Sequence, residues 1–116
     1  MLARRYRLTK KDHVPAVLKE GKMQRGPHFV IRFRENRRTH PRFSVIVSRK
    51  IRDKAVERNR LRRQMYESIR LYIKANPTLP PLDLIVLPKK GLLPLPYATL
   101  SSSLQCLLNK IFKGSR

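Results

Sequence analysis

Four arginines fall within six positions of the segment ERNRLRRQMYESIR, which covers residues 57–70. These four are Arg58, Arg60, Arg62 and Arg63. A guanidinium group offers a planar fork of donors that matches a phosphate or a carboxylate, and the neutral Asn59 between the first two can both donate and accept. Like charges three or four residues apart on a helix cost roughly 0.2–0.5 kcal/mol per pair, so this segment gains little in folding and favours an anionic partner.

The whole chain shares this cationic character. Its 116 residues hold 28 Lys and Arg against 7 Asp and Glu, which gives a net charge of +21. Residues 1–63 alone hold 21 of the basic side chains and 5 of the acidic ones. Such a field attracts polyanions, so nucleic acid is the first expectation and an anionic membrane surface the second. A charged surface without a partner is the weaker alternative, because self-repulsion destabilises a compact state.

Side chains suited to catalysis or metal binding do not gather in this sequence. The glycines form no phosphate-binding loop, and His13, His28 and His40 are isolated. The carboxylates do not pair at a spacing typical of general acid–base catalysis or of a two-metal centre. We therefore expect no catalytic residue and no metal site in the protein. The single cysteine, Cys106, lies among leucines and is expected to be a small core residue in a reducing, cytoplasmic setting.

Three strands are predicted. Alternation in HFVIRFR (28–34) indicates a strand with one buried face and one cationic face that carries Arg32 and Arg34. The β-branched run FSVIVS (43–48) indicates a second strand, and the apolar run LDLIVL (82–87) an interior one.

Three helices connect these strands. The first follows residues 9–12 and ends at Gly21, and the second begins with Asp53 as its cap and runs to about Ala75. The third covers residues 97–113. The expected result is one α+β domain over residues 1–116, with residues 1–8 as a basic, mobile arm, and no apolar run is long enough for a membrane span.

Helical geometry divides the arginine-rich segment. Its apolar stripe consists of Leu61, Met65, Ile69, Tyr72 and Ile73. Asn59 and Arg63 project to the opposite side, whereas Arg62 lies near the edge of the stripe and Arg58 in its middle. Either the first turns overhang the sheet, or Arg58 and Arg62 reach over its end. An ordinary solvated helix face is the alternative, although such a face usually mixes charges of both signs.

The stretch VSRKIRDKAVERNRLRRQMYESIR (47–70) closely resembles the signature of the bacterial ribonuclease P protein component. In that family a Ser or Ala followed by two basic residues precedes an Arg-Asn-Arg helix. RYRLTKKDHVPAVLKEGKMQRGPHFVIRF (5–33) and LDLIVLPKK (82–90) resemble the opening and the C-terminal part of the family, so the resemblance covers nearly the whole chain. It implies a small α/β sandwich of the αβββαβα type, with a central mixed sheet and a left-handed β-α-β crossover.

The resemblance also implies a function, namely a protein subunit of ribonuclease P that assists removal of the 5′ leader of precursor tRNA. The catalyst would be the partner RNA with bound Mg²⁺, and the protein alone would hold no cofactor. The implied RNA-docking set is Arg49, Lys50, Arg58, Asn59, Arg60, Arg62 and Arg63. The implied 5′-leader cleft, between the first helix and the sheet, includes Val14, Leu18, Arg32 and Arg34. A cytoplasmic monomer in a 1:1 complex with the RNA, without a membrane partner, is expected.

Two features depart from the family pattern. The family commonly has aromatic residues where this chain has Val14, Leu18 and Arg32, so stacking, which contributes about 1–3 kcal/mol per base, must be weaker or come from elsewhere. The family often has an arginine where this chain has Tyr66. A ribosomal or other structural RNA-binding protein is the alternative function, and a protein ribonuclease that acts alone is a third.

Overall fold

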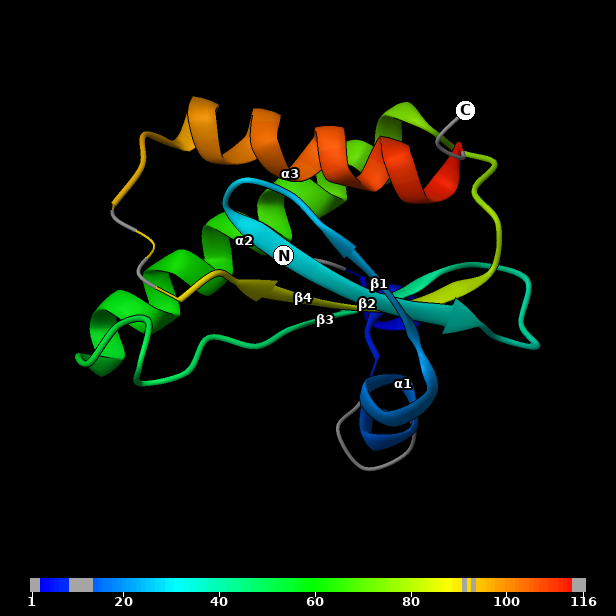
Figure 1. Ribbon diagram of the computed structural model, residues 1–116. Helices are drawn as coiled ribbons and strands as arrows, with labels where there is room; N and C mark the ends of the chain where they lie inside the picture. The colour runs from blue at the N-terminus through cyan, green and yellow to red at the C-terminus, as the bar shows by residue number, and fades with distance from the viewer. Residues whose placement is uncertain (1–2, 9–13, 91, 93, 114–116) are drawn as a thin grey trace.

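The computed structural model describes residues 3–8, 14–90, 92 and 94–113. Figure 1 shows the elements as one αβββαβα succession, preceded by a single 3₁₀ turn. In chain order they are η1 (Arg4–Tyr6), α1 (Val14–Glu20), β1 (Lys22–Arg25), β2 (Phe29–Glu35), β3 (Arg42–Val45), α2 (Ala55–Ala75), β4 (Leu82–Pro88) and α3 (Tyr97–Phe112). The predicted α+β class and element order are confirmed.

The four strands form one mixed sheet in the order β1-β2-β4-β3. β2 is antiparallel to β4, whereas β3 is parallel to β4, so α2 is the crossover between two parallel strands. The interior position predicted for β4 is confirmed, because β4 lies between β2 and β3. β1 has no counterpart among the strands predicted from the pattern, since its four residues are mostly exposed and show no apolar alternation. The handedness of the crossover stays a prediction.

Helices cover the two faces of the sheet unequally. α2 and α3 lie together over one face and α1 lies below the other, as Figure 1 shows. Alternate residues of β2 and β4 enter the larger core beneath α2 and α3, among them Phe29, Ile31, Leu84 and Val86. We call the other face of the sheet the α1 side. A smaller core on this side consists of Leu8, Val17 and Ile85.

A buried ion pair joins the beginnings of the two parallel strands. Arg42 donates from Nε to Asp83 Oδ1 over 2.9 Å and from NH2 to Asp83 Oδ2 over 2.8 Å. Asn36 Nδ2 donates a third hydrogen bond to Asp83 Oδ1 over 2.9 Å. Both charged side chains are almost fully buried, so removal of one partner would leave an uncompensated charge at a cost of about 3–5 kcal/mol.

Three details of the sequence-based prediction are wrong. Asp53 does not cap α2, because the N-cap is Lys54 and no side chain bonds there. Cys106 is exposed, since the leucines of α3 already occupy its buried face. Residues 3–8 are not a free arm: Leu8 is buried, and its amide donates to Phe43 O over 2.8 Å along the edge of β3.

The helices within the described ranges include none that is both long and apolar enough to cross a membrane.

Candidate nucleic-acid interface

Arg58 connects the first turn of α2 to the loop before it. Its NH1 donates to Arg52 O over 3.1 Å and to Asp53 O over 2.5 Å, and the residue is only half-exposed. Its place in the middle of the apolar stripe is explained by these bonds, because the guanidinium turns back onto the backbone beyond the edge of the core. Arg58 therefore fixes the loop before α2 against the first turn of the helix, and its other N–H groups are available to a ligand.

Asn59, Arg62 and Arg63 share one hollow on α2. The residues that line it are Val56, Asn59, Arg62, Arg63, Tyr66 and Glu67. Arg62 NH1 donates to Asn59 Oδ1 over 2.7 Å, which holds these two side chains together. Residues three positions apart are neighbours on the surface of a helix, and this spacing brings the two polar groups into contact.

Tyr66 anchors this part of α2 to the sheet. Its hydroxyl accepts a hydrogen bond of 3.1 Å from the amide of Val45, at the end of the edge strand β3. The departure from the family pattern at this position thus has a structural role. An edge strand exposes amides without partners, and Tyr66 satisfies one of them.

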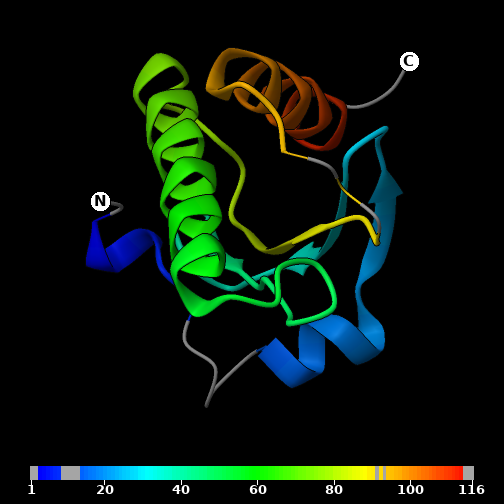
Figure 2. The same ribbon diagram turned by 90° about the vertical axis from the view of Figure 1, so that its left-hand side faces the viewer.

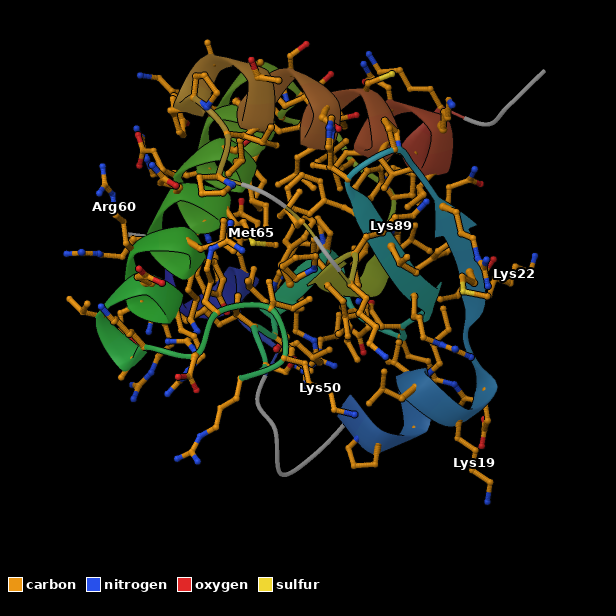
Figure 3. The ribbon with its side chains drawn as sticks, turned by 60° about the vertical axis from the view of Figure 1, so that its left-hand side comes forward. Lys19, Lys22, Lys50, Arg60, Met65 and Lys89 are labelled. Atoms are coloured by element: carbon orange, nitrogen blue, oxygen red, sulfur yellow. The ribbon has the colours of Figure 1, made fainter. Side chains whose placement is uncertain are left out.

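Arg60 lies on the other side of α2 from this hollow. Figure 3 shows its side chain directed away from the sheet, whereas Met65, five residues further along α2, points into the core. It borders a second hollow with Arg52, Leu61 and Leu95. Within the described part of the chain, neither Arg60 nor Arg63 has a hydrogen bond or an ion pair, so both guanidinium groups are available to phosphates.

Acidic side chains neutralise little of this surface. Glu57 is exposed in the first turn of α2, and Glu67 is bonded to Arg70, whose Nε and NH2 donate over 2.9 and 2.6 Å. The hydrogen bonds from Arg70, together with its charge, lower the pKa of Glu67 against a smaller opposing effect of desolvation. The Glu67 carboxylate, one turn after Arg63, is therefore already bonded to Arg70.

Arg49 and Lys50 lie on the exposed turn before α2. In Figure 2 this turn lies beside α1, at the lower end of α2. The predicted RNA-docking residues therefore face in three directions. Arg60 points outward from α2, and Asn59, Arg62 and Arg63 line its hollow. The turn that carries Arg49 and Lys50 lies towards the α1 side.

The strand register arranges the α1 side of the sheet in three rows. Val30 of β2 pairs with Leu87 of β4, Arg32 pairs with Ile85, and Arg34 pairs with Asp83. The rows therefore change from apolar through mixed to charged along the sheet. Arg32 lies in the middle, and its Nε is buried without a hydrogen-bond partner among the described residues.

Of the predicted cleft residues, Leu18, Arg32 and Arg34 lie on this side of the sheet. Leu18 packs on the small core, Arg34 NH1 donates to Glu20 Oε2 over 3.1 Å, and Arg32 lies between them and the apolar row. Val14 begins α1, and its side chain lies outside the described residues.

A groove on the α1 side lies at the end of the sheet nearest α2. Its lining consists of Ile46, Ser48, Lys50, Ile51, Leu87, Pro88 and Lys90. We call it the Lys50 groove. No aromatic residue occurs in this lining, so any base that binds here meets aliphatic side chains. Sequence reasoning missed Ile46, Leu87 and Lys90, although the alternation of β4 already placed Leu87 on the face opposite Val86.

Comparison with known proteins identifies the family. The model of the family described as Ribonuclease P matches residues 2–112. The chain belongs to the ribonuclease P protein family. A ribonuclease P protein component from Sodalis glossinidius is 36% identical over 113 residues, which cover 97% of this chain and 92% of that protein. The component from an Exiguobacterium species is 34% identical and covers 90% of this chain and 88% of its own length.

Solved structures agree with this family. The RNase P protein from Thermotoga maritima matches with a TM-score of 0.74 at 29% identity, over 90% of this chain and 96% of that one. The RNase P protein from Staphylococcus aureus matches with a TM-score of 0.71 over 100% and 98%, and at 23% identity it supports the fold alone. As a ribonuclease P protein component, the chain has a role in a ribonuclease P ribonucleoprotein and in tRNA processing, with the ribonuclease P RNA as its partner. The family decides against the ribosomal alternative.

Proposed function

We propose that this ribonuclease P protein is the accessory subunit of an enzyme whose RNA performs the cleavage of precursor tRNA. It binds that RNA through the start of α2 and the 5′ leader of the substrate through the α1 side of the sheet. The observation that carries this proposal is the separation of two cationic regions. Arg60 of α2 points away from the sheet, whereas Arg32, Lys50 and Lys90 lie along its α1 side.

The start of α2 suits a folded RNA. Arg60 and Arg63 have no internal partner among the described residues, and guanidinium groups bind phosphates through paired hydrogen bonds. The hollow between Asn59 and Tyr66 also holds Val56, an exposed apolar residue, so it can receive a sugar or a base edge as well as phosphates. Arg49 extends the same charge to the turn before the helix, and Lys50 on that turn lies between this region and the groove on the α1 side.

The Lys50 groove suits a single strand. Proteins that bind single-stranded nucleic acid combine a cationic track for the backbone with flat apolar contacts for the bases. Here Lys50 and Lys90 supply charge, and Ile46 and Leu87 supply an apolar floor. The unpaired Arg32 Nε lies one row further along the α1 side, in the row of Ile85, and Leu18 of α1 packs against the small core that contains Ile85. Because aliphatic contacts replace aromatic stacking, we expect binding of the leader to depend strongly on salt and weakly on base identity.

Mg²⁺ belongs to the RNA in this proposal. The charged groups of the proposed surfaces are mostly Arg and Lys, which have no lone pair to offer a cation at neutral pH. The described residues include no cluster of three His, Cys, Asp or Glu side chains that could hold a metal ion. The protein instead lowers the repulsion between RNA and substrate phosphates, so it should lower the Mg²⁺ concentration that cleavage requires.

A single protein bound to each RNA is the stoichiometry we propose. The net charge of +21 makes copies of the free chain repel one another, and the RNA supplies the compensating charge.

Reconstitution tests this function. The protein, its cognate ribonuclease P RNA and a precursor tRNA are combined at low Mg²⁺, with RNA alone and protein alone as controls. Protein plus RNA should cleave at the 5′ end of the mature tRNA and bind the precursor more tightly than mature tRNA. The proposal fails if the protein changes neither cleavage nor leader-dependent binding, or if the protein alone cleaves the precursor.

A further inference from the structure

Hydrogen bonds at both ends hold the loop between β2 and β3, residues 36–41. At its start, the Asn36 amide donates to Pro81 O over 3.1 Å, Asn36 Nδ2 donates to Asp83 Oδ1, and Asn36 Oδ1 accepts from the amide of Arg38 over 2.8 Å. At its end, His40 Nε2 lies 2.8 Å from Arg5 O. The loop is therefore held at both ends, against β4 and against η1.

This loop presents two adjacent arginines that folding does not use. Arg37 and Arg38 are exposed, and within the described residues their guanidinium groups have no hydrogen bond or ion pair. Nearby carboxylates do not compensate them fully, because Asp83 is paired with Arg42 and, among the described residues, Glu35 is the one other carboxylate that lines this hollow. An ordered loop with two unpaired cations is suited to a phosphate ligand.

The hollow below the loop continues the α1 side of the sheet. Its lining is Arg34, Glu35, Asn36, Arg37, Arg38, Arg42 and Asp83. Arg34 and Asp83 form the charged row of the α1 side, four residues along β2 from the row of Val30 and Leu87 that ends in the Lys50 groove. At the rise of a strand, those four residues span about 13 Å. Arg32 lies between the two rows, so cationic groups occur at both ends and in the middle of one face.

We propose that Arg37 and Arg38 form a second phosphate-contact site for single-stranded RNA, occupied by leader nucleotides beyond those held in the Lys50 groove. This inference rests on the proposed binding of the leader to the α1 side. The leader is favoured over the RNA subunit because the loop lies at the end of the sheet opposite the turn that leads into α2. A strand that crosses the face from the groove past Arg32 reaches the loop directly.

The test is a series of precursor tRNAs that differ only in leader length, bound to holoenzyme that carries Arg37→Ala and Arg38→Ala. With a leader of about 12 nucleotides, affinity should fall about tenfold at low salt. The slope of log affinity against log salt should become shallower by about 1.4, since each single-strand phosphate contact contributes about 0.7. With a leader of about 3 nucleotides, and with mature tRNA, affinity should be unchanged.

Matched variants separate a site from the general field of the protein. Lys110→Ala with Lys113→Ala removes the same charge at the end of α3, which covers the opposite face, and should leave the long-leader affinity unchanged. Arg37→Lys with Arg38→Lys should keep most of the salt slope. Thermal unfolding of the alanine variant should match the wild type, because both side chains are exposed and unbonded.

Three results would overturn the inference: an equal loss at every leader length, a loss of RNA-subunit binding, or no loss at all. An equal loss with the α3 variant would also overturn it, since net charge alone would then explain the effect. Failure of the proposed function looks different, because wild-type protein would then fail to distinguish precursor from mature tRNA.

Discussion

The arginines at the start of α2 and those on the α1 side of the sheet differ in what holds them. At α2, Arg58 is bonded to backbone carbonyls and Arg62 to Asn59, while Arg60 and Arg63 are unbonded among the described residues. On the α1 side, Arg34 is paired with Glu20, and Arg32 leaves a buried Nε unsatisfied.

This difference shows that a dense motif is not a uniform contact surface. Part of the Arg-Asn-Arg region maintains the loop and helix that present the rest. The sheet face has fewer arginines, spread along a track between two hollows. We therefore expect substitutions at α2 to divide into those that affect folding and those that affect RNA binding, whereas substitutions on the sheet affect the substrate.

The largest effect is expected when Arg60 and Arg63 are both replaced by Ala. Affinity for the RNA subunit should fall about a hundredfold, and the salt slope should become shallower by about one for each phosphate that the variant no longer binds. Filter binding across a salt series measures both. Unchanged unfolding is the control, and an unchanged salt slope would contradict direct binding of phosphates by these two arginines.

Arg58→Ala tests the structural half of the comparison. Loss of its bonds to Arg52 O and Asp53 O should lower the free energy of unfolding by about 1–2 kcal/mol. Urea denaturation measures this, with Arg63→Ala as the matched control that should cost nothing. If Arg58→Ala unfolds like wild type but weakens RNA binding as Arg60→Ala does, the division within the motif is wrong.

Arg32→Ala tests the sheet face. Affinity of the holoenzyme for precursor tRNA should fall about tenfold, because one desolvated cation is removed from the track. Assembly with the RNA subunit and binding of mature tRNA should not change, and Lys74→Ala, at the far end of α2, provides a control for charge. Equal losses in assembly and in substrate binding would mean that the two regions are not separate.

Tyr66→Phe tests whether α2 depends on its anchor to the edge strand. The Val45 amide loses its partner, so stability should fall by about 1 kcal/mol. Tyr97→Phe is the matched control, since the Tyr97 hydroxyl is buried without a hydrogen-bond partner among the described residues and its removal should not destabilise. Equal effects of the two substitutions would show that the bond to Val45 contributes nothing.

Glu67→Gln should have the smallest effect and the clearest pH dependence. The bond from Arg70 lowers the pKa of Glu67 in the folded protein, so its stabilisation is present above the ordinary pKa of 4.5 and is lost as the pH falls through the lowered folded value. Melting temperatures of wild type and variant should therefore differ slightly at neutral pH and converge in acid. A difference that persists at a pH where Glu67 is protonated in the folded protein would exclude the ion pair as its cause.

Local patterns carried much of the prediction. The alternation of β2, the apolar stripe of α2 and the apolar run of β4 each depend on residues within one element, so their periods are visible in the sequence. The Arg-Asn-Arg segment likewise indicated an RNA-binding helix, and with its flanking motifs it indicated the family that the comparisons established. β1 was missed because four exposed residues carry no period.

What the sequence determined by itself is thus most of the elements, the cationic character and the family. The tertiary structure decided which side chains meet. Ile46, Leu87 and Lys90 become one groove only through the register of β3 on β4, and Arg42 reaches Asp83 across 41 positions. Arg58 and Tyr66 acquire structural roles from the way α2 sits against the loop and the edge strand. Such contacts depend on distances between segments far apart in the chain, and no local period encodes those distances.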